Sequence, residues 1–205
     1  MRHLAATAFA LASLAAAPVF AQEGTAPASP FSVGAQLELM PTGTADVTIS
    51  SPLGSSDDSY DTHTGYGVGV FFAYDVNPHF TIGLAPRLIL GVNFNDPAVQ
   101  NPERPDAKEL DLRARLALHT EVTPGVQLYA FVAPGLSWFI PPDDVNTRGF
   151  SIGGGVGASY DLTPKLFLDA EVGYQKAFFS EELEDASADL DFGYLSVGVG
   201  GGTRF

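Results

Sequence analysis

Four charged residues occupy every second position between residues 109 and 115. Glu109, Asp111, Arg113 and Arg115 are separated by single apolar residues. Successive side chains of a β-strand point to opposite faces, so this spacing places all four charges on one face of a strand. An amphipathic helix is the alternative, but strict alternation over about ten residues favours a strand. Opposite charges on a shared face can form ion pairs, and the arginine fork binds carboxylates through two hydrogen bonds.

The same alternation places four more charges on the polar faces of other predicted strands: Glu38, Arg87, Asp169 and Glu171. If these faces line a narrow barrel, three arginines meet five carboxylates inside it. We interpret the set as a salt-bridged plug, in which Asp169 and Glu171 pair with arginines across the lumen. A gated narrow pore is the alternative. The formal excess of two acids predicts a protonated carboxyl, a bound cation or a water cluster.

Candidate sites for catalysis and for metal ions are weak in this sequence. A lipid-modifying barrel enzyme would use a histidine with a serine or acidic partner at the membrane rim. His63 lies near Ser59 and Asp61, but a solvated loop histidine is the simpler interpretation, so we expect neither catalysis nor a cofactor. Asp57, Asp58 and Asp61 are weak candidate ligands for Ca²⁺ or Mg²⁺, because the ligand spacing of an EF-hand loop is missing.

The composition restricts the function classes. The 205 residues carry a formal net charge of −14 and contain no cysteine. Nucleic-acid binding depends on clustered lysine and arginine, so the acidic balance argues against it. Without cysteine the chain can form neither disulfides nor a lipoprotein anchor. Residues 1–21 have the charged start, apolar run and small-residue cleavage site of a secretory signal, and residues 22–30 are the expected periplasmic lead-in.

A repeated hairpin positions the charged strands. Residues 150–174 form two alternating segments joined by a short turn, with one apolar face and one face of polar and small residues. The turn, DLTPK at 161–165, has counterparts in DVNPH at 75–79 and EVTPG at 121–125, and such Pro-containing sequences favour tight turns. Long polar segments alternate with these turns. We predict that the long segments are loops: residues 41–63, 93–107, 141–149 and 177–190.

This pattern predicts an all-β, eight-stranded antiparallel up-and-down transmembrane β-barrel within residues 31–205, with short periplasmic turns and long extracellular loops. The first strand must pair with the last, because every backbone polar group in a bilayer needs a partner. Inward glycines would leave room for large inward side chains. Pro86 lies on the outward face of a predicted strand, where we expect a bulge or a kink.

The end of the sequence carries a further signal. Phe205 ends an alternating strand in which Leu195, Val197 and Val199 share one face, and this resembles the signal that the barrel-assembly machinery reads. With the strand count and the turn repeat, the chain resembles the OmpA/OmpX-like eight-stranded outer-membrane β-barrel superfamily, of the single-domain kind. The resemblance covers essentially all of residues 31–205. It implies a location in the Gram-negative outer membrane and brings no catalytic motif.

We therefore expect a monomeric outer-membrane protein with a structural or adhesin-like surface role. Four acidic extracellular loops would contact an extracellular ligand whose identity the sequence does not give. Outer-membrane lipids, lipopolysaccharide and the barrel-assembly machinery are the other expected partners. A small ion-conducting pore is the second hypothesis, and a soluble secreted β-barrel that binds an apolar ligand is the third. A lipid-modifying barrel enzyme is a remote alternative.

Overall fold

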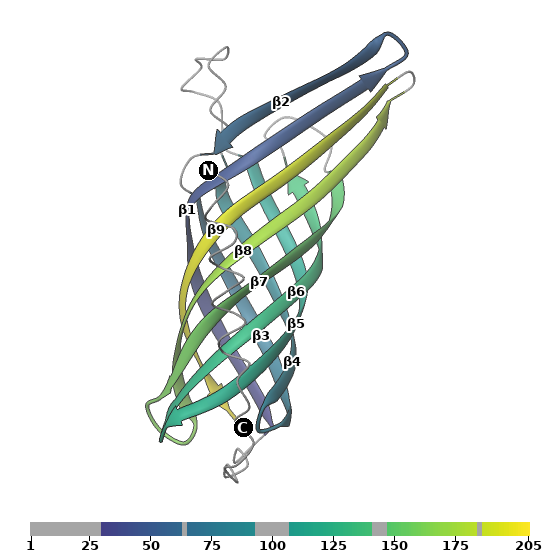
Figure 1. The fold of residues 1–205 in the computed structure, drawn as a ribbon. Helices are drawn as coiled ribbons and strands as arrows, with labels where there is room; N and C mark the ends of the chain where they lie inside the picture. The colour runs from purple at the N-terminus through teal and green to yellow at the C-terminus, as the bar shows by residue number, and fades with distance from the viewer. Residues whose placement is uncertain (1–29, 63–64, 93–106, 141–146, 184–185) are drawn as a thin grey trace.

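The described chain is a closed antiparallel barrel (Figure 1). The computed structural model describes residues 30–62, 65–92, 107–140, 147–183 and 186–205. Their strands are β1 (Phe31–Ser51), β2 (Gly54–Thr62), β3 (Gly65–Asn77), β4 (Phe80–Val92), β5 (Ala107–Thr123), β6 (Val126–Ile140), β7 (Thr147–Asp161), β8 (Leu166–Leu183) and β9 (Ala186–Arg204). The sheet order is β2-β1-β3-β4-β5-β6-β7-β8-β9, and β1 also pairs with β9. The predicted all-β barrel is therefore confirmed.

The ring itself has eight strand positions, because β2 lies in line with β3. β1 pairs with β2 at Gly43↔Thr62 and with β3 at Met40↔Gly65, in one continuous register. β2 thus continues β3 beyond the ring as the partner of the outer part of β1. No helix in the described residues is long and apolar enough to cross a membrane. The predicted signal sequence lies outside the described residues.

The prediction that residues 41–63 form a loop is wrong, and a β-bulge explains why. Gln36, Glu38 and Met40 are buried along β1, but beyond Pro41 the buried positions are Gly43 and Ala45. The β1–β9 register shifts between Leu39 and Thr42, which is the two-against-one arrangement of a bulge. A bulge accommodates the missing N–H of proline and exchanges the inward and outward positions. The strand therefore continues to Ser51.

Residues 177–190 are also wrongly predicted as a loop. β8 and β9 stay paired from Leu166↔Thr203 to Leu183↔Ala186, so this segment is the outer half of a long hairpin. The two hairpins project together beyond the ring (Figure 1). Residues 93–106 and 141–146, the cores of the other two predicted loops, lie outside the described residues.

The bulge expected at Pro86 does not occur. Gly69↔Arg87 and Phe72↔Leu84 have the same register on either side of the proline. Pro86 is paired with Leu112 on the other side, in an unshifted β4–β5 ladder. The strand therefore passes the proline without a change of face.

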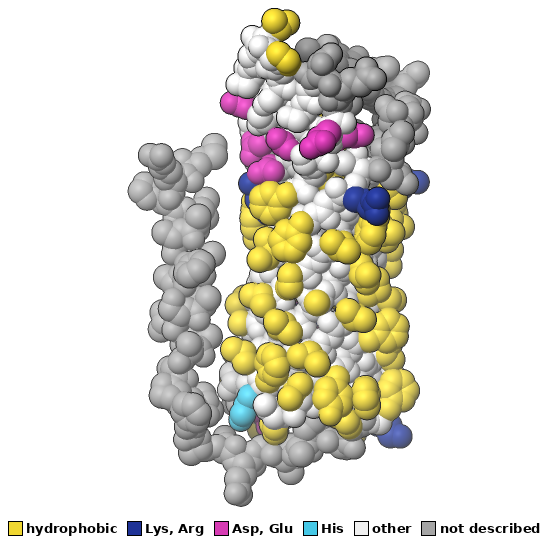
Figure 2. Space-filling model, turned by 90° about the vertical axis from the view of Figure 1, so that its right-hand side faces the viewer, with side chains coloured by type: hydrophobic (Ala, Val, Ile, Leu, Met, Phe, Trp, Pro, Cys, Tyr) yellow, Lys and Arg dark blue, Asp and Glu magenta, His cyan; other side chains and the backbone are white. Residues whose placement is uncertain are grey.

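A belt of apolar side chains covers the outside of the barrel (Figure 2). Leu37 and Leu118 are each 64% exposed although each is paired with a neighbouring strand on both sides. Exposure of this kind is typical of a surface that contacts lipid rather than water. Acidic side chains lie beyond one end of the belt in Figure 2, on the side of the projecting hairpins.

Glycines and large side chains alternate inside the barrel. A Cβ at Gly157 would overlap the ring of Tyr129, and a Cβ at Gly155 would overlap Phe131. Gly157 pairs directly with Tyr129 across the β6–β7 ladder. The inner face of β7 therefore carries glycines, because rings from β6 lie over it. This is expected for a narrow barrel that is filled by its own side chains.

Candidate functional site: the lumen and its periplasmic cavity

The inward face of β5 crosses the whole lumen and gives its levels. The strand runs from the long-loop end at Ala107 to the short turn after Thr123. The buried or half-buried positions on the way are Ala107, Glu109, Asp111, Arg113, Arg115, Ala117 and His119. The alternation of charged and apolar residues along β5 thus places four ionic groups at successive depths.

Arg87 is the centre of the upper ionic network. Its Nη1 donates to Oε2 of Glu38 at 2.5 Å, and its Nε donates to Oδ2 of Asp111 at 3.0 Å. Nη2 donates to Asp111 and to the hydroxyl of Tyr194. Arg87 is 2% exposed and Asp111 is fully buried, so these charges are balanced by one another and not by water.

Arg113 joins the same network from the next level of β5. Nη2 lies 3.4 Å from Oε1 of Glu38, and Nη1 donates to Oε1 of Gln175 at 3.1 Å. The amide nitrogen of Gln175 donates to Oδ2 of Asp111 at 2.9 Å. Asp111 therefore accepts from Arg87, from Gln175 and from Ser137. Strands β1, β4, β5, β6, β8 and β9 all contribute to this layer.

A second network lies nearer the short turns. Arg115 donates to Oε2 of Glu171 at 2.5 Å. Its guanidinium lies over the rings of Phe131 and Tyr129, at 4.1 and 5.2 Å from their centroids. The Tyr129 hydroxyl lies 2.8 and 2.9 Å from the two oxygens of Asp169 and 3.1 Å from Oε2 of Glu171. Cation–π contact and ion pairing together hold Arg115 across the lumen.

Two of the eight predicted lumen residues have no arginine partner. Asp169, expected to pair with an arginine, is instead bonded to Tyr129. Glu109 is fully buried, and neither of its carboxylate oxygens has a hydrogen-bond partner among the described residues. The structure brings the other six together: Glu38, Arg87, Asp111 and Arg113 in the upper network, and Arg115 with Glu171 in the lower one.

Apolar side chains fill the lumen beyond the upper network. A buried cluster at the long-loop end contains Met40, Ala45, Ile89, Ala107, Ala177, Phe179, Phe192 and Tyr194. The rings of Phe192 and Tyr194 are 5.0 Å apart, and those of Phe139 and Phe179 are 5.8 Å apart. Buried described side chains therefore occupy the lumen between the upper network and this cluster.

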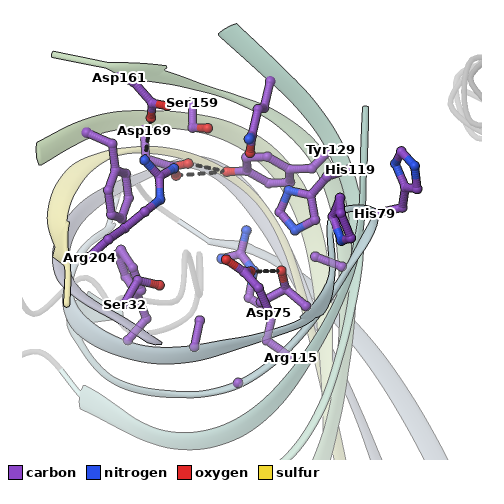
Figure 3. A pocket seen from close by; sticks show the side chains of 18 of the residues that line it. Ser32, Asp75, His79, Arg115, His119, Tyr129, Ser159, Asp161, Asp169 and Arg204 are labelled. Carbon is purple, nitrogen blue, oxygen red and sulfur yellow. Dashed lines mark hydrogen bonds and ion pairs between the residues drawn. The ribbon is translucent and has the colours of Figure 1, made fainter. Parts of the chain in front are cut away.

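The short-turn end of the lumen, by contrast, is open as a cavity of about 320 Å³. Figure 3 shows Asp75, His119, Tyr129 and Asp169 around this space, from strands β3, β5, β6 and β8. Arg204 closes one side, where its Nη1 lies 2.6 Å from Oδ1 of Asp161. In all, 22 residues line the cavity, and the aromatic rings of Phe71 and Phe167 are among them.

The weak metal candidates do not converge on one point. Asp57 and Asp61 share one face of β2, and Asp58 points to the other, because strand side chains alternate. Among the described residues no group of three or more His, Cys, Asp or Glu side chains could hold a metal ion. Asp46 instead accepts from Ser59 at 2.7 Å, which ties the β1–β2 hairpin together.

Several lumen residues were not selected from the sequence. Tyr194, Gln175 and Ser137 complete the hydrogen bonds of Arg87 and Asp111, but each is a common residue at an inward position. Tyr129 is one of the large inward side chains, and its hydroxyl lies within hydrogen-bond distance of two carboxylates, those of Asp169 and Glu171. The alternation identifies such residues as inward, yet their partners come from strands distant in the sequence.

The structure describes two histidines, His79 and His119. His119 lies inside the barrel, with its ring 5.7 Å from that of Tyr129, and neither ring nitrogen has a described hydrogen-bond partner. His79 is exposed in the short turn after β3. His63 lies outside the described residues.

Known proteins of similar fold are outer-membrane barrels. Neisserial surface protein A has 19% identity and a TM-score of 0.53, with 86% of this chain and 98% of that one covered. OprG from Pseudomonas aeruginosa has 16% identity and a TM-score of 0.57, with 87% and 97% covered. AlkL, solved in lipid bilayers, has 12% identity and a TM-score of 0.50, with 92% and 97% covered. At these identities the likeness concerns the fold alone.

The sequence itself identifies the family. No curated protein matches it significantly. A family model described as the outer membrane protein beta-barrel domain matches residues 7–202, which is most of the chain. The chain therefore belongs to the outer membrane protein β-barrel domain family and is a protein of the Gram-negative outer membrane.

Proposed function

We propose that this protein is a closed barrel that anchors an acidic extracellular β-sheet and acts through that sheet in a structural or adhesin-like role. The observation that carries the proposal is the packed upper lumen. Arg87, Glu38 and Asp111 are at most 4% exposed, and the cluster around Phe179 and Phe192 lies beyond them. A path for hydrated ions would have to separate buried ion pairs and apolar side chains, which is costly.

Planar-bilayer recording tests whether the lumen is closed. We expect no stepwise conductance from the wild-type barrel, because the upper network leaves no open path. Replacing Arg87 and Arg113 by alanine should produce conductance events, since both guanidiniums leave the layer. Ohmic steps from the wild-type barrel would contradict the closed state and favour the small ion-conducting pore instead.

We propose that the β1–β2 hairpin and the adjacent outer part of β9 form the surface that contacts a partner. The β1–β2 hairpin carries Asp46, Asp57, Asp58 and Asp61, and its strand partner β9 carries Asp189 and Asp191. Asp46 and Asp191 lie directly opposite each other, and Lys176 lies 2.7 Å from Asp191 and reduces their repulsion. Such a surface favours basic partners, in a salt-dependent way.

Adhesion of cells that display the protein tests this role. Cells should adhere to a surface coated with poly-lysine more strongly than to one coated with polyglutamate. A variant with Asn at positions 57, 58 and 61 should lose much of that difference, while Lys165→Gln in a short turn should not. Equal adhesion of the Asn variant and the wild type would contradict a role for the acidic hairpin.

We propose no catalytic role, because His119 lies inside the lumen, away from the lipid-facing rim. Lipid and lipopolysaccharide contacts, and a monomeric state, remain part of the proposal. Phe205 remains the proposed signal for the barrel-assembly machinery. Its backbone N–H donates to the carbonyl of Phe31 at 3.0 Å, and its side chain is 68% exposed, where a receptor could contact it.

A further inference from the structure

The periplasmic cavity has more carboxylates than cations. Among its lining acids, Asp161 is paired with Arg204. Arg115 also lines the cavity, but its ion pair is with Glu171. The remaining lining acids, Asp75, Glu121 and Asp169, form no ion pair with any described residue. The space enclosed by these walls is therefore electronegative, and the low-dielectric barrel around it strengthens the field.

Asp169 keeps hydrogen-bonding capacity on the cavity side. The hydroxyl of Tyr129 has one proton, yet it lies within 3.1 Å of three carboxylate oxygens, two of Asp169 and one of Glu171. One proton can serve only one of these acceptors at a time, whereas two carboxylates can accept several hydrogen bonds. Asp169 can thus accept further hydrogen bonds from a donor in the cavity.

Aromatic and proline side chains form part of the cavity wall. The rings of Phe71 and Phe167 are 6.0 Å apart, and both line the space. The guanidinium of Arg204 already lies over the Phe167 ring, 4.7 Å from its centroid. The wall is therefore suited to apolar groups and to cations above a ring face. Tyr129 adds a third ring beside Asp169.

We propose that this cavity is a binding site for a small organic cation, an amine with an apolar body. Its ammonium group donates to Asp169, and its body lies against Phe71 and Tyr129. The space is concave, has a volume of about 320 Å³, and combines apolar rings with converging polar groups, and small-ligand sites are usually concave in this way. The cavity lies at the opposite end of the barrel from the acidic hairpins, so this site is independent of the surface role proposed above.

The test uses three probes of nearly equal shape: benzylammonium, benzyl alcohol and benzoate. Each is titrated into the full barrel in lipid nanodiscs and into empty nanodiscs, and binding is followed by calorimetry and ligand-observed NMR. Benzylammonium should bind about tenfold more tightly than benzyl alcohol, because only the ammonium forms charge-assisted hydrogen bonds. Benzoate should not bind, and added salt should weaken the binding of benzylammonium.

Two aspartate variants locate the site. Asp169→Asn should weaken benzylammonium binding about tenfold, since the charge is lost while the shape is retained. Asp57→Asn, on the outer hairpin, is the matched control and should bind like the wild type. Heat-modifiable migration on gels confirms that both variants are folded. Equal binding of benzylammonium and benzyl alcohol, no binding above empty nanodiscs, or an Asp169→Asn barrel that binds like the wild type would each overturn the proposal.

Discussion

Arg87 is the residue on which most of the upper lumen depends. It contacts Glu38, Asp111 and Tyr194 through three different nitrogen atoms, with its side chain shielded from solvent. Removing one member of a buried ionic group is more damaging than replacing the whole group, because the remaining charges stay buried without a partner. Loss of this guanidinium would remove an ion pair from both Glu38 and Asp111, which would stay buried.

Arg87→Met should therefore destabilise the barrel by about 3–5 kcal/mol. Methionine fills much of the same volume, so the loss measures charge rather than packing. Urea unfolding of the barrel in lipid vesicles, followed by tryptophan fluorescence, gives the difference. Arg148→Met, on the exposed outer face, should change stability by less than about 0.5 kcal/mol. Equal losses in the two variants would contradict the network.

Glu109 is the exception among the buried acids, and it should respond differently to neutralisation. Because neither of its oxygens has a described partner, Glu109→Gln removes a formal charge without breaking a described contact. We expect unchanged or higher stability in the same unfolding measurement. Asp111→Asn, which weakens bonds from Arg87, Ser137 and Gln175, should cost about 1–3 kcal/mol. A large loss from Glu109→Gln alone would indicate that the ionised form is stabilised in the barrel.

At the scale of the strand, the glycines of β7 leave space for the aromatic rings of β6. A methyl group at Gly157 would overlap the ring of Tyr129, whereas one at Gly67 would have its nearest neighbours at an ordinary 3.5 Å. Gly157→Ala should thus cost about 1–3 kcal/mol through overpacking, and Gly67→Ala should cost little. Adding Tyr129→Leu to Gly157→Ala should recover part of the loss, as a double-mutant cycle would show. Additive effects would rule out the predicted contact.

The alternation of side chains along a strand decides which parts of the fold can be predicted from the sequence. It located the inward charges, the short turns and the closure of the barrel, because period-two patterning follows directly from the pleat. It failed at Pro41, where the bulge exchanges the two faces and the pattern stops matching a single strand. It also failed at residues 177–190, whose acidic composition resembles a loop although both strands remain paired.

The candidate site was harder to predict than the strands. Alternation shows that Asp169 points inward, but its partner Tyr129 comes from β6, about 40 positions away. Whether Asp169 pairs with Tyr129 or with an arginine depends on the depth of each side chain along the barrel axis. That depth is set by the tilt and stagger of the strands. The cavity depends on the same stagger, since its lining comes from both ends of the chain, Ser32 and Arg204.

For the whole molecule, the projecting hairpin and the ring are separable parts. β1 pairs with β9 from Ser32 through the bulge to Ala45, which belongs to the lumen cluster, and on to Ser50 near the tip of the projecting hairpin. Replacing residues 48–57 by Asn-Gly, which favours a tight hairpin turn, should therefore leave a folded barrel. Heat-modifiable migration should persist, and the poly-lysine adhesion proposed above should fall. Loss of the folded band would show that the projection is needed for closure.

The pairing of β1 with β9 joins residues near both ends of the chain, from Ser32↔Arg204 to Ser50↔Ser187. No part of this seam can form until the last strand has been delivered, so the search for it spans nearly the entire polypeptide. Before that moment the backbone amides and carbonyls along the two edges have no hydrogen-bond partners. Such unpaired groups are energetically costly in the hydrocarbon core of a bilayer. We therefore expect insertion and seam formation to be coupled, because an inserted but open barrel would leave both edges without hydrogen-bond partners.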